Sequence, residues 1–155
     1  MVKRNVDIKY RRINADELPA LITLYKFLHT TDAPLPDDNQ LKQIWLEFLA
    51  DRKVNCLVAE VDNCLVATCV LTIIPNLTRG ARPYGLIENV VTHAEYRKKG
   101  IGTGLLHYAQ TLARESNCHK VMLITQRQEE STLRFYDNAG FQRNGRTAFV
   151  AYLDK

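Results

Sequence analysis

The chain has 155 residues, 46% of them hydrophobic and 25% charged, with a formal net charge of +4. This length is typical of one domain, and a domain of this size folds without disulfides or a structural metal. The composition excludes a disordered chain, and no apolar run reaches the roughly 18 residues that a membrane helix needs. We therefore expect one domain over residues 1–155, in the cytoplasm, with no membrane partner. The mildly positive charge suits an anionic ligand.

The cysteines and histidines show no metal-ligand spacing. The four cysteines form no CxxC pair, and the four histidines lie far apart. We therefore expect no bound metal. Cys56, Cys64 and Cys69 lie in apolar stretches, where a free cysteine behaves as a small buried hydrophobic residue.

Alternation and helical spacing predict the elements of the first half of the chain. Residues 6–13 alternate and predict a strand, and residues 18–28 and 41–49 have the spacing of amphipathic helices. The apolar face of the second helix includes Ile44 and Trp45. Two β-rich runs, 54–61 and 65–74, flank Asp62 and Asn63, a pair that suits a hairpin turn.

The second half alternates strands and helices. We expect a loop over 75–84, strands over 86–92 and 121–125, helices over 101–114 and 131–139, and a last strand over 149–153. Strand–helix–strand units indicate parallel neighbours, whereas the hairpin is antiparallel. The sequence therefore predicts an α/β (α+β) fold, with a mixed sheet and helices on both faces.

The glycine-rich segment after strand 86–92 is the most informative. Arg97, Lys98 and Lys99 precede Gly100 and Gly102 at the start of a helix. Free N–H groups and the dipole of a helix start attract anions, and glycines let a phosphate approach the backbone. The segment lacks the P-loop and dinucleotide-binding patterns. Taken alone, it is either a phosphate site or an ordinary basic turn.

Two motifs together resemble the GNAT acyltransferase superfamily. Arg97-x-x-Gly100-x-Gly102 is similar to its pyrophosphate-binding motif, and the stretch from Phe135 to Phe141, FYDNAGF, is similar to its downstream signature. The order of elements matches that family over nearly the whole chain. The resemblance implies the GNAT fold, a mostly antiparallel sheet that is splayed between its fourth and fifth strands, and acetyl-CoA as cosubstrate.

The resemblance also implies which residues bind acetyl-CoA. Backbone groups of the fourth strand would hold the pantetheine arm, the glycine turn would hold the pyrophosphate, and Ser131 stands where many relatives have an asparagine that contacts the pantetheine. The implied residues are Val90, Val91, Thr92, His93, Arg97, Lys98, Lys99, Gly100, Ile101, Gly102, Thr103 and Ser131.

Two residues are candidates for proton transfer. By the resemblance, Tyr136 is the acid that protonates the departing thiolate; its alternative role is packing beside Phe135. Glu88 is the candidate base, because it interrupts an apolar strand in which an unpaired buried carboxylate is costly. A structural Glu88 paired with an arginine or a backbone group is the alternative.

Acceptor residues are expected in and beside the fourth strand. Arg79 and Arg82 of the preceding loop suit a carboxylate or phosphate of the acceptor, unless that loop is only a solvated surface, and Asn89 adjoins Glu88. We predict an N-acetyltransferase that acetylates a primary amine of a small molecule or peptide in a ternary complex. The alternative is a catalytically weak CoA-binding sensor. The dispersed basic residues do not suggest a nucleic-acid partner, and the family suggests a homodimer.

Overall fold

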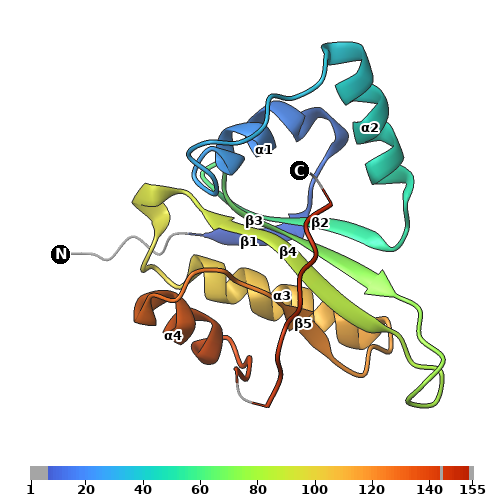
Figure 1. Cartoon of the computed structure of the whole chain (residues 1–155). Coiled ribbons are helices and arrows are strands. Elements are labelled where there is room, and N and C mark those ends of the chain that lie inside the picture. Colours follow the sequence, from blue (N-terminus) through green and yellow to red (C-terminus); the bar gives the residue numbers. More distant parts are fainter. Residues whose placement is uncertain (1–6, 144, 154–155) are drawn as a thin grey trace.

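The structure, a computed structural model, describes residues 7–143 and 145–153. A five-stranded sheet has the order β1-β2-β3-β4-β5 and is flanked by four α-helices (Figure 1). The strands are β1 (Ile8–Arg12), β2 (Val54–Val61), β3 (Cys64–Ile74), β4 (Tyr84–Thr92) and β5 (Val121–Leu123). The helices are α1 (Leu18–Tyr25), α2 (Asp38–Ala50), α3 (Ile101–Glu115) and α4 (Glu130–Asn138). None of the helices in these ranges is long and apolar enough to cross a membrane.

Local chemistry explains several of these elements. Asp62 and Asn63 have φ values of 49° and 62°, the left-handed conformation that a two-residue hairpin loop requires, so the predicted β2–β3 hairpin is confirmed. The Asp37 carboxylate caps α2 by accepting from the N–H groups of Asn39 and Gln40, both at 3.0 Å. Pro19 lies in the first turn of α1, where its missing N–H is tolerated.

The sheet has one apolar core on each face, as the sequence predicts. On one face, residues of β2, β3 and β4 pack against α3, including Leu57, Leu71, Ile87, Leu105 and Leu106. On the other face, α1 and α2 cover a smaller cluster. Its buried members are Ile13, Leu21, Trp45, Cys56, Val58 and Val70. Figure 1 shows the sheet between these two helical layers, with α1 and α2 above it and α3 and α4 below.

Two burial predictions are wrong. Ile44 is 47% exposed, because α2 contacts the sheet mainly through the neighbouring Trp45, whose indole N–H donates to the Ala15 carbonyl at 2.8 Å. Cys64 is exposed, since it is the first residue after the hairpin turn, whereas Cys56, Cys69 and Cys118 are buried. The apolar surroundings of a residue in the sequence therefore do not ensure its burial.

The predicted last strand over 149–153 is also wrong. The structure has no strand there, and Phe149 and Leu153 are both 92% exposed. β5 ends at Leu123, two residues earlier than predicted, and supplies no ladder for a further strand. In Figure 1 the segment runs as an extended trace past β5 and β4. A hydrogen bond of 2.9 Å from the Gln126 amide to the Tyr152 hydroxyl connects it to the loop after β5.

The sheet opens between β4 and β5. The parallel pairing of β4 with β5 covers only Gly85, Leu86 and Ile87. On the β3 side, Val70 pairs with Glu88 and Thr68 with Val91, so β4 contains a bulge at Asn89, which has φ 53°. A bulge bends its strand. The predicted splay between the fourth and fifth strands is therefore confirmed.

Candidate active site

The free edge of β4 forms one wall of the candidate site. From Glu88 to Thr92, β4 has no strand partner on the β5 side among the described residues. Unpaired N–H and C=O groups along a strand edge bind an extended ligand as an added strand would. The edge ends at His93, whose N–H donates to the Val66 carbonyl at 2.8 Å and fixes the end of β4 to β3.

The glycine turn lies directly beyond this edge, at the N-terminus of α3. Gly100 is the N-cap residue with φ 78°, and no side chain caps the helix there. The N–H groups of the first turn of a helix have no partner within the helix, and the helix dipole makes this end positive. A Cβ added at Gly100 would meet no atom within 4 Å. The turn therefore offers an open surface with free donors, which fits a pyrophosphate.

Gly102 also has a packing role. It is buried, and a Cβ added there would meet Phe135 of α4 and the Thr92 hydroxyl, both at 3.1 Å. The absence of a side chain at Gly102 lets α3 pack closely against α4 and the end of β4. Only Gly100 matches the expectation of open space for a phosphate.

The basic residues of the turn are exposed, but they differ in their contacts. The Arg97 guanidinium donates from Nε to the Thr92 carbonyl at 3.0 Å and from Nη2 to the Phe27 carbonyl at 3.5 Å. It therefore connects the end of β4 to the segment after α1. The Lys99 ammonium lies 5.1 Å from the centre of the Tyr96 ring, and Lys98 has φ 60°. His93 packs against Phe27, with ring centres 4.4 Å apart.

Tyr136 and Glu88 lie close enough to interact electrostatically. Tyr136, on α4, packs between Phe135 and Phe141, at ring-centre distances of 4.9 and 6.3 Å. Burial raises the pKa of Tyr136, the positive charge of Arg127 lowers it, and the negative charge of Glu88 raises it. The Glu88 side chain is exposed, so the expectation of a buried carboxylate is wrong. The Tyr136 phenol therefore lies within electrostatic range of Glu88, which borders the opening of the sheet.

The sequence did not identify two residues around this opening. Arg127, in the loop after β5, donates to the Leu28 carbonyl at 3.3 Å and reaches the surroundings of Tyr136. Its only sequence signal is a lone cation shortly before the FYDNAGF motif. Tyr25, on α1, faces Asn89, and burial is the main cause of its raised pKa. No local pattern singles out Tyr25, because its partners lie far away in the chain.

Cys69 is a potential nucleophile near the site, but its environment makes it inert. It lies opposite the β4 bulge, is fully buried, and burial raises the pKa of its thiol. Since the thiolate is the nucleophilic form, a thiol that remains protonated is a poor nucleophile. Among the described residues, no group of three or more His, Cys, Asp or Glu side chains is arranged to hold a metal ion.

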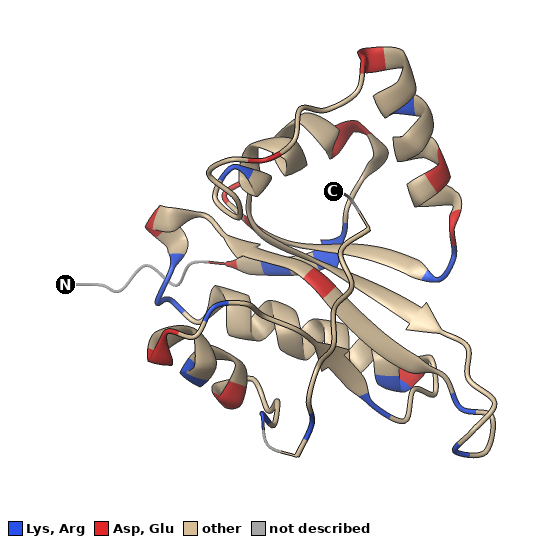
Figure 2. Ribbon diagram, viewed as in Figure 1, with Lys and Arg blue, Asp and Glu red and all other residues tan. Residues whose placement is uncertain are grey.

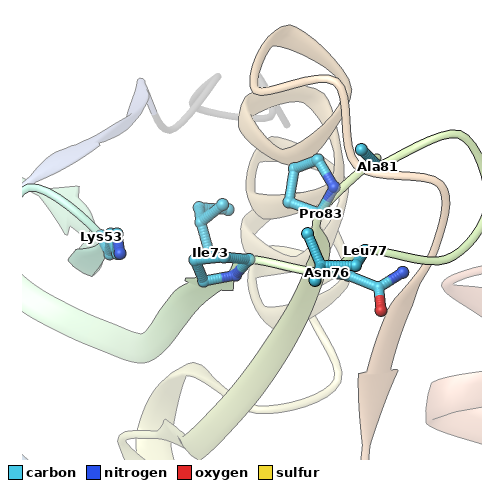
Figure 3. Close-up of a pocket in the computed structure, with 7 residues that line it drawn as sticks. Lys53, Ile73, Asn76, Leu77, Ala81 and Pro83 are labelled. Carbon is cyan, nitrogen blue, oxygen red and sulfur yellow. The ribbon is translucent and has the colours of Figure 1, made fainter.

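The remaining candidates are placed differently. Ser131 is exposed as the second residue of α4 and does not cap the helix, because the N-cap residue is Glu129. Arg79 and Arg82 lie in the β3–β4 loop, at the opposite end of β4 from the glycine turn. A hollow of about 580 Å³ beside this loop is lined by Lys53, Ile73, Pro75, Asn76, Leu77, Ala81 and Pro83 (Figure 3). It contains none of the predicted site residues.

An open strand edge that leads to an uncapped helix start, with the half-buried Tyr136 on the neighbouring helix α4, is the arrangement expected of an acyltransferase that uses a CoA thioester. Comparison with known proteins gives the same class. A sequence model described as the acetyltransferase (GNAT) family matches residues 18–141. The chain therefore belongs to the GNAT acetyltransferase family, whose acetyl donor is acetyl-CoA.

Individual relatives agree with this assignment. The chain is 30% identical to glucosamine 6-phosphate N-acetyltransferase of Trypanosoma brucei brucei, over 91% of this chain and 93% of that protein. A solved structure from Agrobacterium tumefaciens, described as an acetyltransferase, is 35% identical with a TM-score of 0.86, and the match covers 93% of this chain and 99% of that one. Glucosamine-6-phosphate N-acetyltransferase of Arabidopsis thaliana, 21% identical with a TM-score of 0.82 over 96% and 99% of the two chains, shares the fold. The chain is thus an acyltransferase that transfers an acetyl group to an amine.

Proposed function

We propose that residues 1–155 form one acetyltransferase domain in which acetyl-CoA and a primary amine of a small molecule or peptide bind together, and the amine attacks the acetyl group directly. The observation that carries this proposal is that Glu88 lies where the pairing of β4 with β5 ends, within electrostatic range of the Tyr136 phenol. One is a protonated phenol and the other an exposed carboxylate. Acyl transfer to an amine needs an acid and a base of this kind.

The donor would occupy the open edge of β4 and the turn beyond it. In this proposal the backbone of residues 90–93 holds the pantetheine arm, residues 97–103 hold the pyrophosphate, and Ser131 contacts the arm from α4. The free edge, the uncapped helix start and the open space at Gly100 support this placement. The Arg97 guanidinium is bonded to two backbone carbonyls, so we assign it mainly to shaping the turn.

The environments of Glu88 and Tyr136 suit them to opposite roles in proton transfer. An amine must lose a proton to attack, and the exposed Glu88 receives it directly or through water. The departing thiolate needs a proton, and the Tyr136 phenol, whose pKa is raised by burial, carries one at neutral pH. Asn89 lies beside Glu88 on the acceptor side. The inertness of the buried Cys69 supports direct transfer without an acetyl-enzyme.

We also propose a homodimer. Four apolar side chains near the C-terminus, Phe149, Val150, Tyr152 and Leu153, are between 60% and 92% exposed. β5 is an edge strand and is followed by Ile124, itself 54% exposed. Apolar surface of this kind marks an interaction site, and a second copy would cover it. The four free cysteines agree with a cytoplasmic location.

The central test is ligand binding followed by turnover. Acetyl-CoA should stabilise the folded protein by about 2.7 kcal/mol at a hundredfold excess over its Kd, and NAD should not. A panel of amines, including amino sugars with and without phosphate, peptides and polyamines, should then reveal the acceptor through CoA release. An unchanged melting temperature with millimolar acetyl-CoA would refute the proposal. Binding without turnover on any amine would instead indicate a CoA sensor.

Glu88→Gln tests the base. At neutral pH the variant should have a lower kcat/KM, by roughly 10²-fold for the loss of a general base. The deficit should shrink as pH rises, because more of the amine is already neutral. Glu115→Gln, an exposed change at the end of α3, is the matched control. A deficit that does not depend on pH would mean that Glu88 positions the acceptor.

A further inference from the structure

A second hollow lies at the end of β4 that is remote from the glycine turn. It has a volume of about 460 Å³, within the range of small-ligand sites. Its walls come from the β3–β4 loop, the starts of β4 and β5, and the segment after α4. The residues that matter for its chemistry are Asn76, Arg79, Tyr84, His119, Lys120 and Arg146.

The charges in this cleft are uncompensated. Arg79, Lys120 and Arg146 are cationic, and among the described residues no Asp or Glu lines the cleft or forms an ion pair with them. Figure 2 shows Lys and Arg on the β3–β4 loop and near the start of β5, at the same end of the molecule. Burial lowers the pKa of His119, and the positive charges of Lys120, Arg79 and Arg82 lower it further. The charged groups that shift the pKa of His119 are therefore all positive.

The loop that carries Arg79 is braced. Arg82 donates to the carbonyls of Asn117 at 3.2 Å and Cys118 at 3.1 Å, which fixes the loop to the segment before β5. The Asn76 amide donates to the Thr78 carbonyl at 3.0 Å and to the Arg82 carbonyl at 3.2 Å. The Lys120 ammonium lies 5.5 Å from the Tyr84 ring centre. A loop that is already braced loses less conformational entropy when a ligand binds.

We propose that this cleft is a second anion-binding site, separate from the acetyl-CoA site, that binds the phosphate group of a small molecule. Three cations around one hollow match the charge of a phosphate better than that of a single carboxylate, and a guanidinium donates to phosphate oxygens in pairs. The cleft begins at Tyr84 and the glycine turn follows Thr92, so the two sites are roughly 25 Å apart at the rise of a strand.

The phosphate has two sources: a free small molecule, or the acceptor itself. Tyr84 and Glu88 are an even number of residues apart in β4 and lie on one face of it, opposite to Ile87, which packs towards α3. Along the strand they are roughly 13 Å apart. An extended acceptor would thus reach both Glu88 and the cleft, and in that case Arg79 would contact its distal end.

Binding of inorganic pyrophosphate to the full chain saturated with CoA tests the site, because CoA then occupies the glycine turn. Titration calorimetry should still detect pyrophosphate binding. Lys120→Gln and Arg146→Gln should each weaken it by roughly tenfold, the equivalent of one charged hydrogen bond. Lys42→Gln on α2 and Arg52→Gln remove the same charges from exposed positions elsewhere and should leave it unchanged.

Two results would refute the proposal of this second site. One is the absence of pyrophosphate binding once CoA is saturating, and the other is an equal loss in the cleft variants and the controls. Unchanged CoA affinity shows that each variant is folded. This test needs no turnover, so failure of the proposed acetyltransferase mechanism would not affect it.

Steady-state kinetics with phosphorylated and unphosphorylated amines identify the source of the phosphate. This experiment, unlike the binding test, rests on the proposed function. If the phosphate belongs to the acceptor, Lys120→Gln should raise KM for a phosphorylated amine by roughly tenfold and leave KM for its unphosphorylated counterpart unchanged. An equal response of the two amines would assign the cleft to a free phosphorylated ligand.

Discussion

The two edges of β4 differ in how many of their residues pair with a neighbouring strand. On the edge that faces β3, seven residue pairs run from Tyr84 to Thr92 and are interrupted only by the bulge at Asn89. On the edge that faces β5, three pairs end at Ile87. Buried backbone groups without a partner are costly, so the second edge is complete only with a ligand or water. The closed edge stabilises the fold, and the open edge is available for chemistry.

Tyr136→Phe should have the largest effect on activity. It changes a side chain of α4 that concerns the chemistry at the open edge and leaves the closed edge unaltered. The variant retains the ring and loses the proton, so kcat should fall by roughly 10²–10⁴-fold while acetyl-CoA affinity and stability change little. Because burial raises the pKa of Tyr136 above the usual value for a tyrosine, the wild-type acid stays protonated throughout the neutral pH range. Deprotonation of Tyr136 should therefore not lower kcat in the neutral pH range. Steady-state kinetics across pH check both points.

A matched tyrosine makes the Tyr136 experiment specific. Tyr108→Phe on α3 also removes a hydroxyl from a half-buried ring, one that packs against Tyr10 at a ring-centre distance of 6.4 Å. It should retain full activity. Full activity of Tyr136→Phe would show that solvent, and not this phenol, protonates the thiolate.

Leu71→Ala acts on the closed edge. Leu71 is fully buried in the larger core and pairs with Ile87 across the β3–β4 ladder. Its truncation should lower the free energy of unfolding by about 2–5 kcal/mol, measured by denaturant titration. Leu123→Ala on β5, which is half-buried at the open side, should cost less than Leu71→Ala. An equal cost would mean that β5 contributes as much to the fold as the antiparallel ladder.

Gly100→Ala separates strain from ligand access. At φ 78° an added Cβ costs about 1–2 kcal/mol of stability, and at this position it also occupies the approach to the turn. Acetyl-CoA affinity should therefore fall by roughly tenfold. Gly140→Ala is the control, because Gly140 has φ 89° and equally open surroundings outside the turn. It should lose similar stability and keep its affinity, and equal acetyl-CoA affinities in the two variants would contradict the role of the turn.

The features that the sequence predicts well depend on local chemistry. The β2–β3 hairpin follows from Asp62 and Asn63, two residues that tolerate positive φ. The start of α3 follows from a strand, a basic turn and Gly100 in immediate succession. Each signal lies within a few residues of the feature that it predicts, so no knowledge of distant partners is needed.

The features that the sequence predicts poorly depend on distant partners. Residues 149–153 have an apolar pattern suited to a strand, but a strand exists only where another strand pairs with it. Gly102 is explained by Phe135, 33 positions later. The exposure of Glu88 follows from the opening of the sheet beside it, although its neighbours in sequence are apolar. Arg127 reaches the site through a contact with Leu28 on the other side of the chain's midpoint.

The smallest effects are expected at Asn89, the bulge residue of β4, which interrupts the pairing with β3 and lies just beyond the end of the pairing with β5. Asn89 has φ 53°, a conformation that glycine adopts freely, asparagine tolerates and alanine disfavours. Asn89→Ala should therefore lower the free energy of unfolding by about 1 kcal/mol, and Asn89→Gly should change it by less than about 0.5 kcal/mol. Both variants remove the side chain that faces Tyr25. If this side chain contacts the acceptor, KM for the acceptor should rise equally in both. A rise in Asn89→Ala alone would mean that the bulge matters for catalysis through its backbone geometry, because only that variant strains it.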